Sequence, residues 1–231
     1  MTSAATNVTR FSERLKGVTA PRYIAVEGPI GAGKTTLTRR LAEALGYTTL
    51  LEPVAENPFL DAFYRDGRSN ALPTQLFFLL HRARQIADLP TRDLLGPTVV
   101  SDFLMDKDEL FAKLTLTPEE FTLYQQIQSA LDIQAPVPDL VIYLQARTDV
   151  LLHRVRQRGI KSEQLMEPDY LEQLADAYTE FFHFYDKAPV LIVNASEIDF
   201  AGNDDHFEAL FDAMLRVDGM RHYFNPNPTL L

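Results

Sequence analysis

Short apolar runs alternate with longer segments of helical spacing along most of the chain after Pro21. The apolar runs are nearly continuous and rich in β-branched residues, which is typical of strands covered on both faces of a parallel sheet. They predict strands at residues 23–27, 48–51, 98–101, 140–144 and 190–194. The segments between them predict helices at residues 34–45, 73–88, 107–114, 118–134, 149–158, 168–184 and 204–217. This alternation predicts an α/β fold with a five-stranded parallel sheet flanked by helices.

The domain organisation follows from the absence of a long linker or an internal repeat. We expect a single domain over residues 22–218, with helical pieces inserted between the second and third strands. Pro118 and Pro168 are each followed by acidic residues, a pattern that favours helix starts at both positions. Residues 1–21 are interpreted as a polar N-terminal arm and residues 219–231 as a C-terminal tail.

Composition narrows the class of protein. The 231 residues include 22 Lys and Arg against 32 Asp and Glu, and the net charge of −10 argues against nonspecific binding to a nucleic-acid polymer or an anionic membrane. The chain has no cysteine, which excludes disulfides and thiolate chemistry and favours a cytoplasmic location. Any anionic ligand must therefore be held by local positive groups.

Neither a membrane span nor a secretory signal is predicted. The longest apolar run, residues 76–80, is far shorter than the ~20 residues of a transmembrane helix. Residues 1–21 lack the apolar core of a signal peptide. A transit peptide is a minor alternative, because Arg10, Arg14 and Lys16 lie among Ser and Thr, while Glu13 counts against it.

A glycine-rich phosphate-binding loop follows the first predicted strand. Residues 28–35 (GPIGAGKT) fit the pattern G-x-x-x-x-G-K-[ST] and open a predicted helix. Glycines let the backbone N–H groups point at phosphate oxygens, Lys34 supplies charge, and Thr35 offers a hydroxyl to Mg²⁺. The sequence therefore predicts a nucleoside triphosphate site made of Gly28, Gly31, Ala32, Gly33, Lys34, Thr35 and Thr36.

Acidic residues follow the second and third predicted strands. Asp102 is placed to reach the same Mg²⁺ as Thr35, although it would serve equally as a cap for the next helix. Glu52 lies where parallel sheets bind ligands, so it is a candidate base for an acceptor hydroxyl, with a solvated loop glutamate as the alternative. The N-K-x-D motif of Ras-like GTPases is absent.

Several motifs together resemble the deoxynucleoside kinase family. They are EGPIGAGKTT at residues 27–36, EPVAENPFL at residues 52–60, Phe63-Tyr64, and Gln75. The resemblance covers about residues 22–184 and is closest to the bacterial deoxyadenosine/deoxyguanosine kinase branch. It implies a P-loop kinase fold and a Mg²⁺-dependent transfer of the γ-phosphate of ATP to the 5′-hydroxyl of a deoxyribonucleoside, with purines favoured. It also implies a homodimer built on helices.

The resemblance assigns roles on the acceptor side. Glu52 would be the base that activates the 5′-hydroxyl, and Tyr64 would donate a hydrogen bond to the 3′-hydroxyl. Gln75 would pair with the nucleobase edge. Arg82 lies two helical turns further on and would approach the base, unless it is a surface arginine. Phe78, one turn from Gln75, is the one feature that would narrow the pocket toward pyrimidines.

Residues 153–163 (HRVRQRGIKSE) resemble the arginine-rich phosphate lid of the family, which we place at about residues 154–165. Arg158 is the candidate to stabilise charge on the transferred group. Arg154 and Arg156 would flank the adenine or contact phosphate, with one of them on the solvated surface of the helix. Glu163 matches the glutamate that binds the 3′-hydroxyl. The alternative for the whole run is an ordinary basic helix C-terminus.

Two departures from the family pattern bear on mechanism. Where the family has an acid followed by Arg-Ser, this chain has Asp102-Phe103-Leu104, so an arginine near the acceptor is missing and Arg82 or a lid arginine would have to replace it. Ile160 stands where the lid has a further arginine, and Lys161 beside it would compensate only as a flexible point charge.

Two other functions fit the phosphate-binding loop. A thymidylate or other nucleoside monophosphate kinase would have the same fold, but it would need further arginines for the monophosphate, and Asp102-Phe103 departs from the Asp-Arg pair of those enzymes. A noncatalytic nucleotide-binding module is supported only by the missing arginine.

Overall fold

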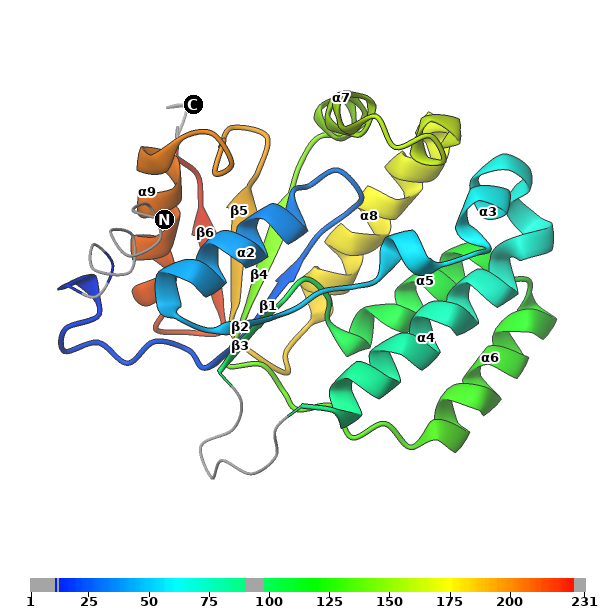
Figure 1. The fold of residues 1–231 in the computed structure, drawn as a ribbon, viewed down its shortest axis with the longest axis horizontal. Coiled ribbons are helices and arrows are strands. Elements are labelled where there is room, and N and C mark those ends of the chain that lie inside the picture. Colours follow the sequence, from blue (N-terminus) through cyan, green and yellow to red (C-terminus); the bar gives the residue numbers. More distant parts are fainter. Residues whose placement is uncertain (1–10, 12, 90–97, 227–231) are drawn as a thin grey trace.

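The computed structural model describes residues 11, 13–89 and 98–226, which form one parallel six-stranded sheet with helices on both faces (Figure 1). The strand order is β2-β3-β1-β4-β5-β6. The strands are β1 (Tyr23–Glu27), β2 (Thr48–Leu50), β3 (Val99–Ser101), β4 (Leu140–Gln145), β5 (Val190–Asn194) and β6 (Arg221–Phe224). The α/β class and the parallel sheet are therefore confirmed.

Strand β1 lies at the point where the order of the sheet reverses. It pairs with β3 on one side, where Tyr23 lies opposite Val99, and with β4 on the other, where Glu27 lies opposite Tyr143. Every residue of β1 is buried, as expected for a strand covered on both faces. In open parallel sheets, ligands bind beyond the carboxyl ends of the strands at such a reversal.

Helices α4, α5 and α6 lie side by side at one side of the sheet, while α9 lies at the other (Figure 1). The α-helices are α2 (Lys34–Leu45), α3 (Leu60–Asp66), α4 (Ala71–Ala87), α5 (Asp108–Thr115), α6 (Pro118–Leu131), α7 (Thr148–Arg158), α8 (Pro168–Phe184) and α9 (Asp204–Leu215). Short 3₁₀ helices are η1 (Val54–Glu56), η2 (Gly67–Asn70), η3 (Met105–Lys107) and η4 (Glu163–Leu165). Within the described ranges, no helix is long and apolar enough to cross a membrane.

Local sequence chemistry explains most element boundaries. Thr117 caps α6 through the backbone N–H of Glu120, whose side chain in turn accepts from the backbone of Thr117. Helix α4 begins two residues before the predicted start at Pro73, because a proline in the first turn loses only an N–H that has no partner within the helix. The predicted 118–134 helix ends earlier, at Leu131, where Asp132 takes a left-handed conformation (φ 43°).

The expectation of five strands was wrong, because β6 adds a sixth to the sheet within the segment interpreted as a C-terminal tail. It pairs in parallel with β5, from Val190 opposite Arg221 to Val193 opposite Phe224. Its residues alternate between exposed and half-buried, since the strand lies at the edge of the sheet. An edge strand of four residues with Arg and His lacks the continuous apolar run that marked the other strands.

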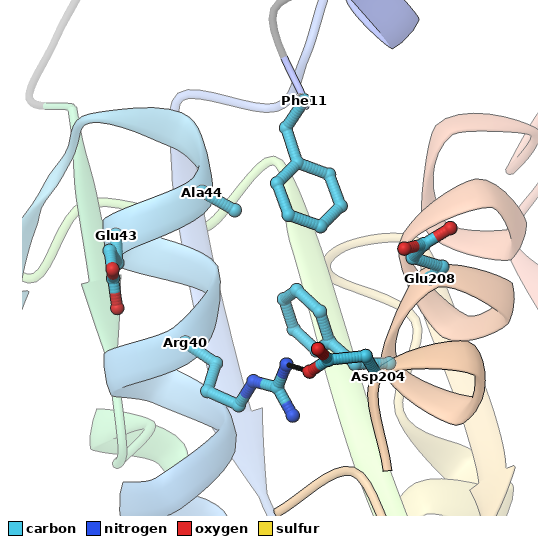
Figure 2. Close-up of a pocket in the computed structure, with 7 residues that line it drawn as sticks. Phe11, Arg40, Glu43, Ala44, Asp204 and Glu208 are labelled. Atoms are coloured by element: carbon cyan, nitrogen blue, oxygen red, sulfur yellow. Dashed lines mark hydrogen bonds and ion pairs between the residues drawn. The ribbon is translucent and has the colours of Figure 1, made fainter. Parts of the chain in front are cut away.

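The described part of the segment interpreted as a polar arm includes Phe11, which is buried against the domain. The Phe11 ring lies 4.7 Å from that of Phe211 and 5.5 Å from that of Phe207, both on α9. Arg14 pairs with two acidic side chains of α9. Figure 2 shows Phe11 above a gap between α2 and α9 that is closed below by an ion pair of 2.5 Å between Arg40 and Asp204. This gap of about 20 Å³ has room for about one water molecule.

Candidate active site

The loop between β1 and α2 has the backbone conformation of a phosphate cradle. Gly28, Gly31 and Gly33 all have positive φ angles. A Cβ atom at Gly31 would lie 2.8 Å from the carbonyl oxygen of Leu151, so only glycine fits there without a shift of the backbone. Helix α2 begins at Lys34 and directs its N-terminal N–H groups toward the loop.

Lys34 lies along the same loop. Its ammonium donates to the carbonyl oxygens of Gly28 at 2.7 Å and Pro29 at 3.3 Å. Burial, followed by the nearby charge of Lys107, lowers the pKa of Lys34 to about 8. The side chain is therefore mostly charged at neutral pH and loses its charge as the pH rises through about 8.

Asp102 joins the loop to the second strand. Its Oδ2 accepts a hydrogen bond of 2.6 Å from the Thr35 hydroxyl, and its Oδ1 accepts one of 2.7 Å from the Glu52 backbone N–H. The next helical segments are preceded by Leu104 and Lys107 at their N-caps, so Asp102 does not cap them. Thr35 and Asp102 thus place two hard oxygen donors side by side at the carboxyl edge of the sheet.

Glu52 is held by two cations instead of projecting into solvent. Arg82 donates to its Oε1 at 2.7 Å from Nε, and the Lys107 ammonium lies 3.7 Å from the same oxygen. Burial acts to raise the pKa of Glu52, but Arg82, Lys107 and Lys34 outweigh it and hold that pKa down at about 2. The group is a carboxylate whose Oε2 has no hydrogen-bond partner among the described residues, which rules out the solvated-loop alternative.

Arg82 is buried, so its interpretation as a surface arginine was wrong. Its guanidinium also pairs with the buried carboxylate of Asp108. Gln75 lies on the same face of α4, as predicted from the helical spacing, and its amide donates to the Thr115 hydroxyl at 3.2 Å. Phe78 on this face lies 5.3 Å from the guanidinium of Arg82, measured to the ring centre.

Tyr64 and Glu163 approach the site from α3 and η4. Burial raises the pKa of Tyr64 well above its ordinary value, so the phenol is a hydrogen-bond donor at any physiological pH. Glu163 is buried and accepts a hydrogen bond of 3.0 Å from Nε of Arg158, the last residue of α7. This contact joins the end of α7 to η4 within the lid segment.

The three lid arginines have different surroundings. Arg158 and Arg154 both line the central cavity. Arg154 donates to the carbonyl oxygens of Ala195 at 2.7 Å and Ile198 at 3.4 Å. Arg156 is exposed and lies outside the cavity lining, so it is the one on the solvated surface of the helix.

One cavity of about 990 Å³ brings the predicted residues together at the carboxyl edge of the sheet. Apart from Gly28, the first residue of the loop, and the exposed Arg156, every predicted site residue lines it: Gly31, Ala32, Gly33, Lys34, Thr35, Thr36, Glu52, Tyr64, Gln75, Arg82, Asp102, Arg154, Arg158 and Glu163. One end holds phosphate-binding groups, and the other holds a carboxylate, an amide and a phenol suited to a polar acceptor.

Comparison with known proteins identifies the family to which this site belongs. The family profile described as "Deoxynucleoside kinase" matches residues 24–217. The chain belongs to the deoxynucleoside kinase family. Among the relatives of this kinase, the deoxyguanosine kinase of Bacillus subtilis (strain 168) is 38% identical over 197 residues, covering 83% of this chain and 95% of that protein. A deoxyadenosine kinase of Lactobacillus acidophilus is 32% identical over 196 residues, covering 79% and 89%.

Solved structures agree with the family assignment. The deoxyadenosine kinase from M. mycoides with bound dCTP superposes with a TM-score of 0.71 at 27% identity, covering 83% of this chain and 98% of that one. The kinase therefore transfers a phosphoryl group from a nucleotide donor to a deoxynucleoside. This decides against the nucleoside monophosphate kinase and noncatalytic interpretations.

Two charged residues of the deoxynucleoside kinase site were not predicted. Lys107 and Asp108 lie at the junction of η3 and α5, and both are buried. In the sequence they sit beside Asp106 and Glu109, so the run is typical of a solvated helix start. Asp106 does face outward, where it pairs with the exposed Lys187. Nothing in the local pattern separated the inward side chains from the outward ones.

Proposed function

We propose that the enzyme phosphorylates the 5′-hydroxyl of purine deoxyribonucleosides, with ATP as donor and Mg²⁺ as cofactor. The observation that carries this proposal is the continuous chain of contacts from Thr35 through Asp102 to Glu52. It joins the phosphate-binding loop to a buried carboxylate that lies at the acceptor end of the same cavity. A hydroxyl held at Glu52 would therefore face the terminal phosphate of a nucleotide held on the loop.

The residues present fit Mg²⁺. This ion usually takes one or two protein oxygen ligands and completes its shell with phosphate and water, and Thr35 and Asp102 supply a hydroxyl and a carboxylate. When bound, Mg²⁺ would neutralise negative charge on the phosphate groups. Lys34 and the loop amides bind the triphosphate, and Arg158 stabilises charge on the transferred group.

On the acceptor side, Glu52 orients the 5′-hydroxyl and takes its proton as the new bond to phosphorus forms. Its Oε2 serves this purpose, because Arg82 and Lys107 occupy Oε1. Tyr64 and Glu163 contact the 3′-hydroxyl from the lid side. Because both groups need that hydroxyl, the pair favours deoxynucleosides over analogues that lack it.

Purine preference is supported by the relatives and by the base end of the cavity. The names of the two relatives above are deoxyguanosine and deoxyadenosine kinase. Gln75 has an amide that both donates and accepts, and Arg82, which lines the same cavity, adds a further donor. Phe78 also lines the cavity, and it is the one residue that argues for pyrimidines, because its ring would narrow the space for the base.

A homodimer built on α4 and α6 is part of the proposal. These neighbouring helices expose the large apolar side chains of Leu80, Leu123 and Leu131, and each exposes more than a third of its surface. Burial of these side chains against a second copy would remove apolar area from water. We place the enzyme in the cytoplasm on the strength of its cysteine-free composition.

A substrate panel tests the proposal. Purified enzyme is assayed with deoxyadenosine, deoxyguanosine, deoxycytidine, thymidine and thymidine monophosphate, with ATP or GTP as donor, in the presence of Mg²⁺ or EDTA. We expect the highest kcat/KM with a purine deoxynucleoside, ATP and Mg²⁺. Higher kcat/KM with a pyrimidine would contradict the base preference, and undiminished turnover in EDTA would contradict the role of the metal.

A further inference from the structure

Lys107 is a buried cation in the wall of the catalytic cavity. Its side chain is only 2% exposed. Lysine is almost never buried to this extent unless an opposite charge accompanies it. The ammonium lies 3.2 Å from Oε1 of Glu27 and 3.7 Å from Oε1 of Glu52. It therefore lies between the end of β1, where the phosphate-binding loop begins, and the carboxylate proposed to activate the acceptor.

Three hydrogen bonds fix the Glu27 carboxylate that pairs with this cation. The carboxylate accepts hydrogen bonds from the backbone N–H of Leu104 at 2.6 Å and of Gly28 at 3.2 Å, and from the Tyr178 hydroxyl at 2.9 Å. A carboxylate fixed in this way positions the ammonium from one side. An ammonium has three donors, and the separation of 3.7 Å from Glu52 is too long for a hydrogen bond, so donors remain for a ligand in the cavity.

Three other cations that line the cavity already have partners in the protein. Lys34 donates to the carbonyl oxygens of the loop, Arg82 pairs with Glu52 and Asp108, and Arg158 pairs with Glu163. The charges of Lys107 and Lys34 also repel each other across the site. An anion that binds close to both ammonium groups would offset this repulsion, so the pair favours the binding of an anion.

We propose that Lys107 is a catalytic cation, which donates to the phosphoryl group during transfer and takes the place of the arginine that the family pattern predicts at position 103. This inference rests on the proposed function. In the step, the 5′-oxygen bonds to the γ-phosphorus while the bond from that phosphorus to the β–γ bridging oxygen breaks. ADP leaves with that electron pair, and the hydroxyl proton passes to Glu52. Lys107 balances the charge that develops on the phosphoryl oxygens and keeps Oε1 of Glu52 in place.

The test compares Lys107→Met, Lys107→Arg and a control, Lys113→Met. Lys113 is an exposed lysine of α5 that pairs with Glu109 on the surface. We expect Lys107→Met to lower kcat at least ~100-fold, as for loss of one charged donor at a developing anion. Its dissociation constant for ATP should stay within about threefold of the wild-type value, since Lys34 and the loop bind the donor. Lys107→Arg should recover part of kcat, and Lys113→Met should match the wild type.

A second variant separates catalysis from folding, because Lys107→Met leaves Glu27 buried without its cation. In Glu27→Gln/Lys107→Met both charges are removed together. The amide oxygen of Gln can accept from the Leu104 backbone N–H, and its NH2 group can donate to the Tyr178 hydroxyl oxygen. We expect this double variant to be folded by circular dichroism and thermal melting and to have the same loss of kcat. A folded double variant with kcat close to wild type would overturn the role of Lys107. Wild-type enzyme that phosphorylated no deoxynucleoside would instead overturn the proposed function.

Discussion

Thr35 and Asp102 share a hydrogen bond of 2.6 Å although 67 positions separate them in the chain. The contact exists because β1 and β3 are adjacent parallel strands, whose carboxyl ends meet at one edge of the sheet. It joins the glycine-rich loop, proposed to bind the donor, to the residue that accepts from the Glu52 backbone N–H. The separation between donor and acceptor is therefore set by the spacing of neighbouring strands, which is a rigid property of the fold.

Replacing the proposed base should abolish turnover without loss of donor binding. Glu52→Gln keeps the shape of the side chain but removes the proton acceptor, so we expect kcat to fall by ~10²-fold or more. The measurement is steady-state turnover of a deoxynucleoside alongside equilibrium binding of ATP. Glu172→Gln, at an exposed position of α8, is the matched control. Unchanged kcat in Glu52→Gln would reject Glu52 as the base.

Donor affinity should weaken above about pH 8. The pKa of Lys34 lies at about 8 in the free enzyme, and bound triphosphate favours the charged ammonium, so the pKa rises on binding. Affinity is then greatest below pH 8 and falls as the pH rises, by at most about tenfold per pH unit. Isothermal titration of ATP from pH 7 to 10 measures this dependence. Lys34→Arg, which stays charged, should have a flatter profile.

Arg82 should contribute strongly to stability because it neutralises the buried carboxylate of Asp108 and the 11% exposed carboxylate of Glu52. Arg82→Met leaves Glu52 and Asp108 without that partner, and we expect a loss of about 3–5 kcal/mol in the free energy of unfolding. Arg82→Met/Asp108→Asn should lose less, since one of the uncompensated charges is also removed. Urea unfolding of both variants and the wild type gives the comparison. Equal losses in the two variants would contradict the expected destabilisation by an unpaired Asp108 carboxylate.

Phe11 should stabilise the domain without affecting catalysis. Its ring is 4% exposed and packs on Phe207 and Phe211, so Phe11→Ala should cost about 3–5 kcal/mol of unfolding free energy. We expect kcat and KM to stay at wild-type values, because α9 carries none of the proposed site residues. Val18→Ala, at a position 43% exposed, is the control and should change stability little. Equal stability of the two variants would contradict the docking of this segment.

Patterns that act over a few residues were sufficient to predict much of this kinase. The glycine-rich loop, the strand before it and the helix after it depend on local backbone freedom and on hydrophobic period. The predicted strands all formed within one residue of their expected bounds. Glu52 and Asp102 could be expected to converge because parallel strands end at a common edge.

The tertiary structure decided which charged side chains turn inward. Asp106 and Lys107 are neighbours of the same polar run, yet Asp106 pairs with exposed Lys187 while Lys107 is buried between Glu27 and Glu52. Only the packing of η3 against the end of β1 and the position of Glu52 distinguish them. Strand β6 and the docking of Phe11 likewise depend on partners more than 30 positions away. The sequence by itself predicted the phosphate-binding loop, because that loop is made of contiguous backbone. The tertiary structure decided which cations surround the acceptor, because a buried charge is tolerated only where the fold brings distant opposite charges to it.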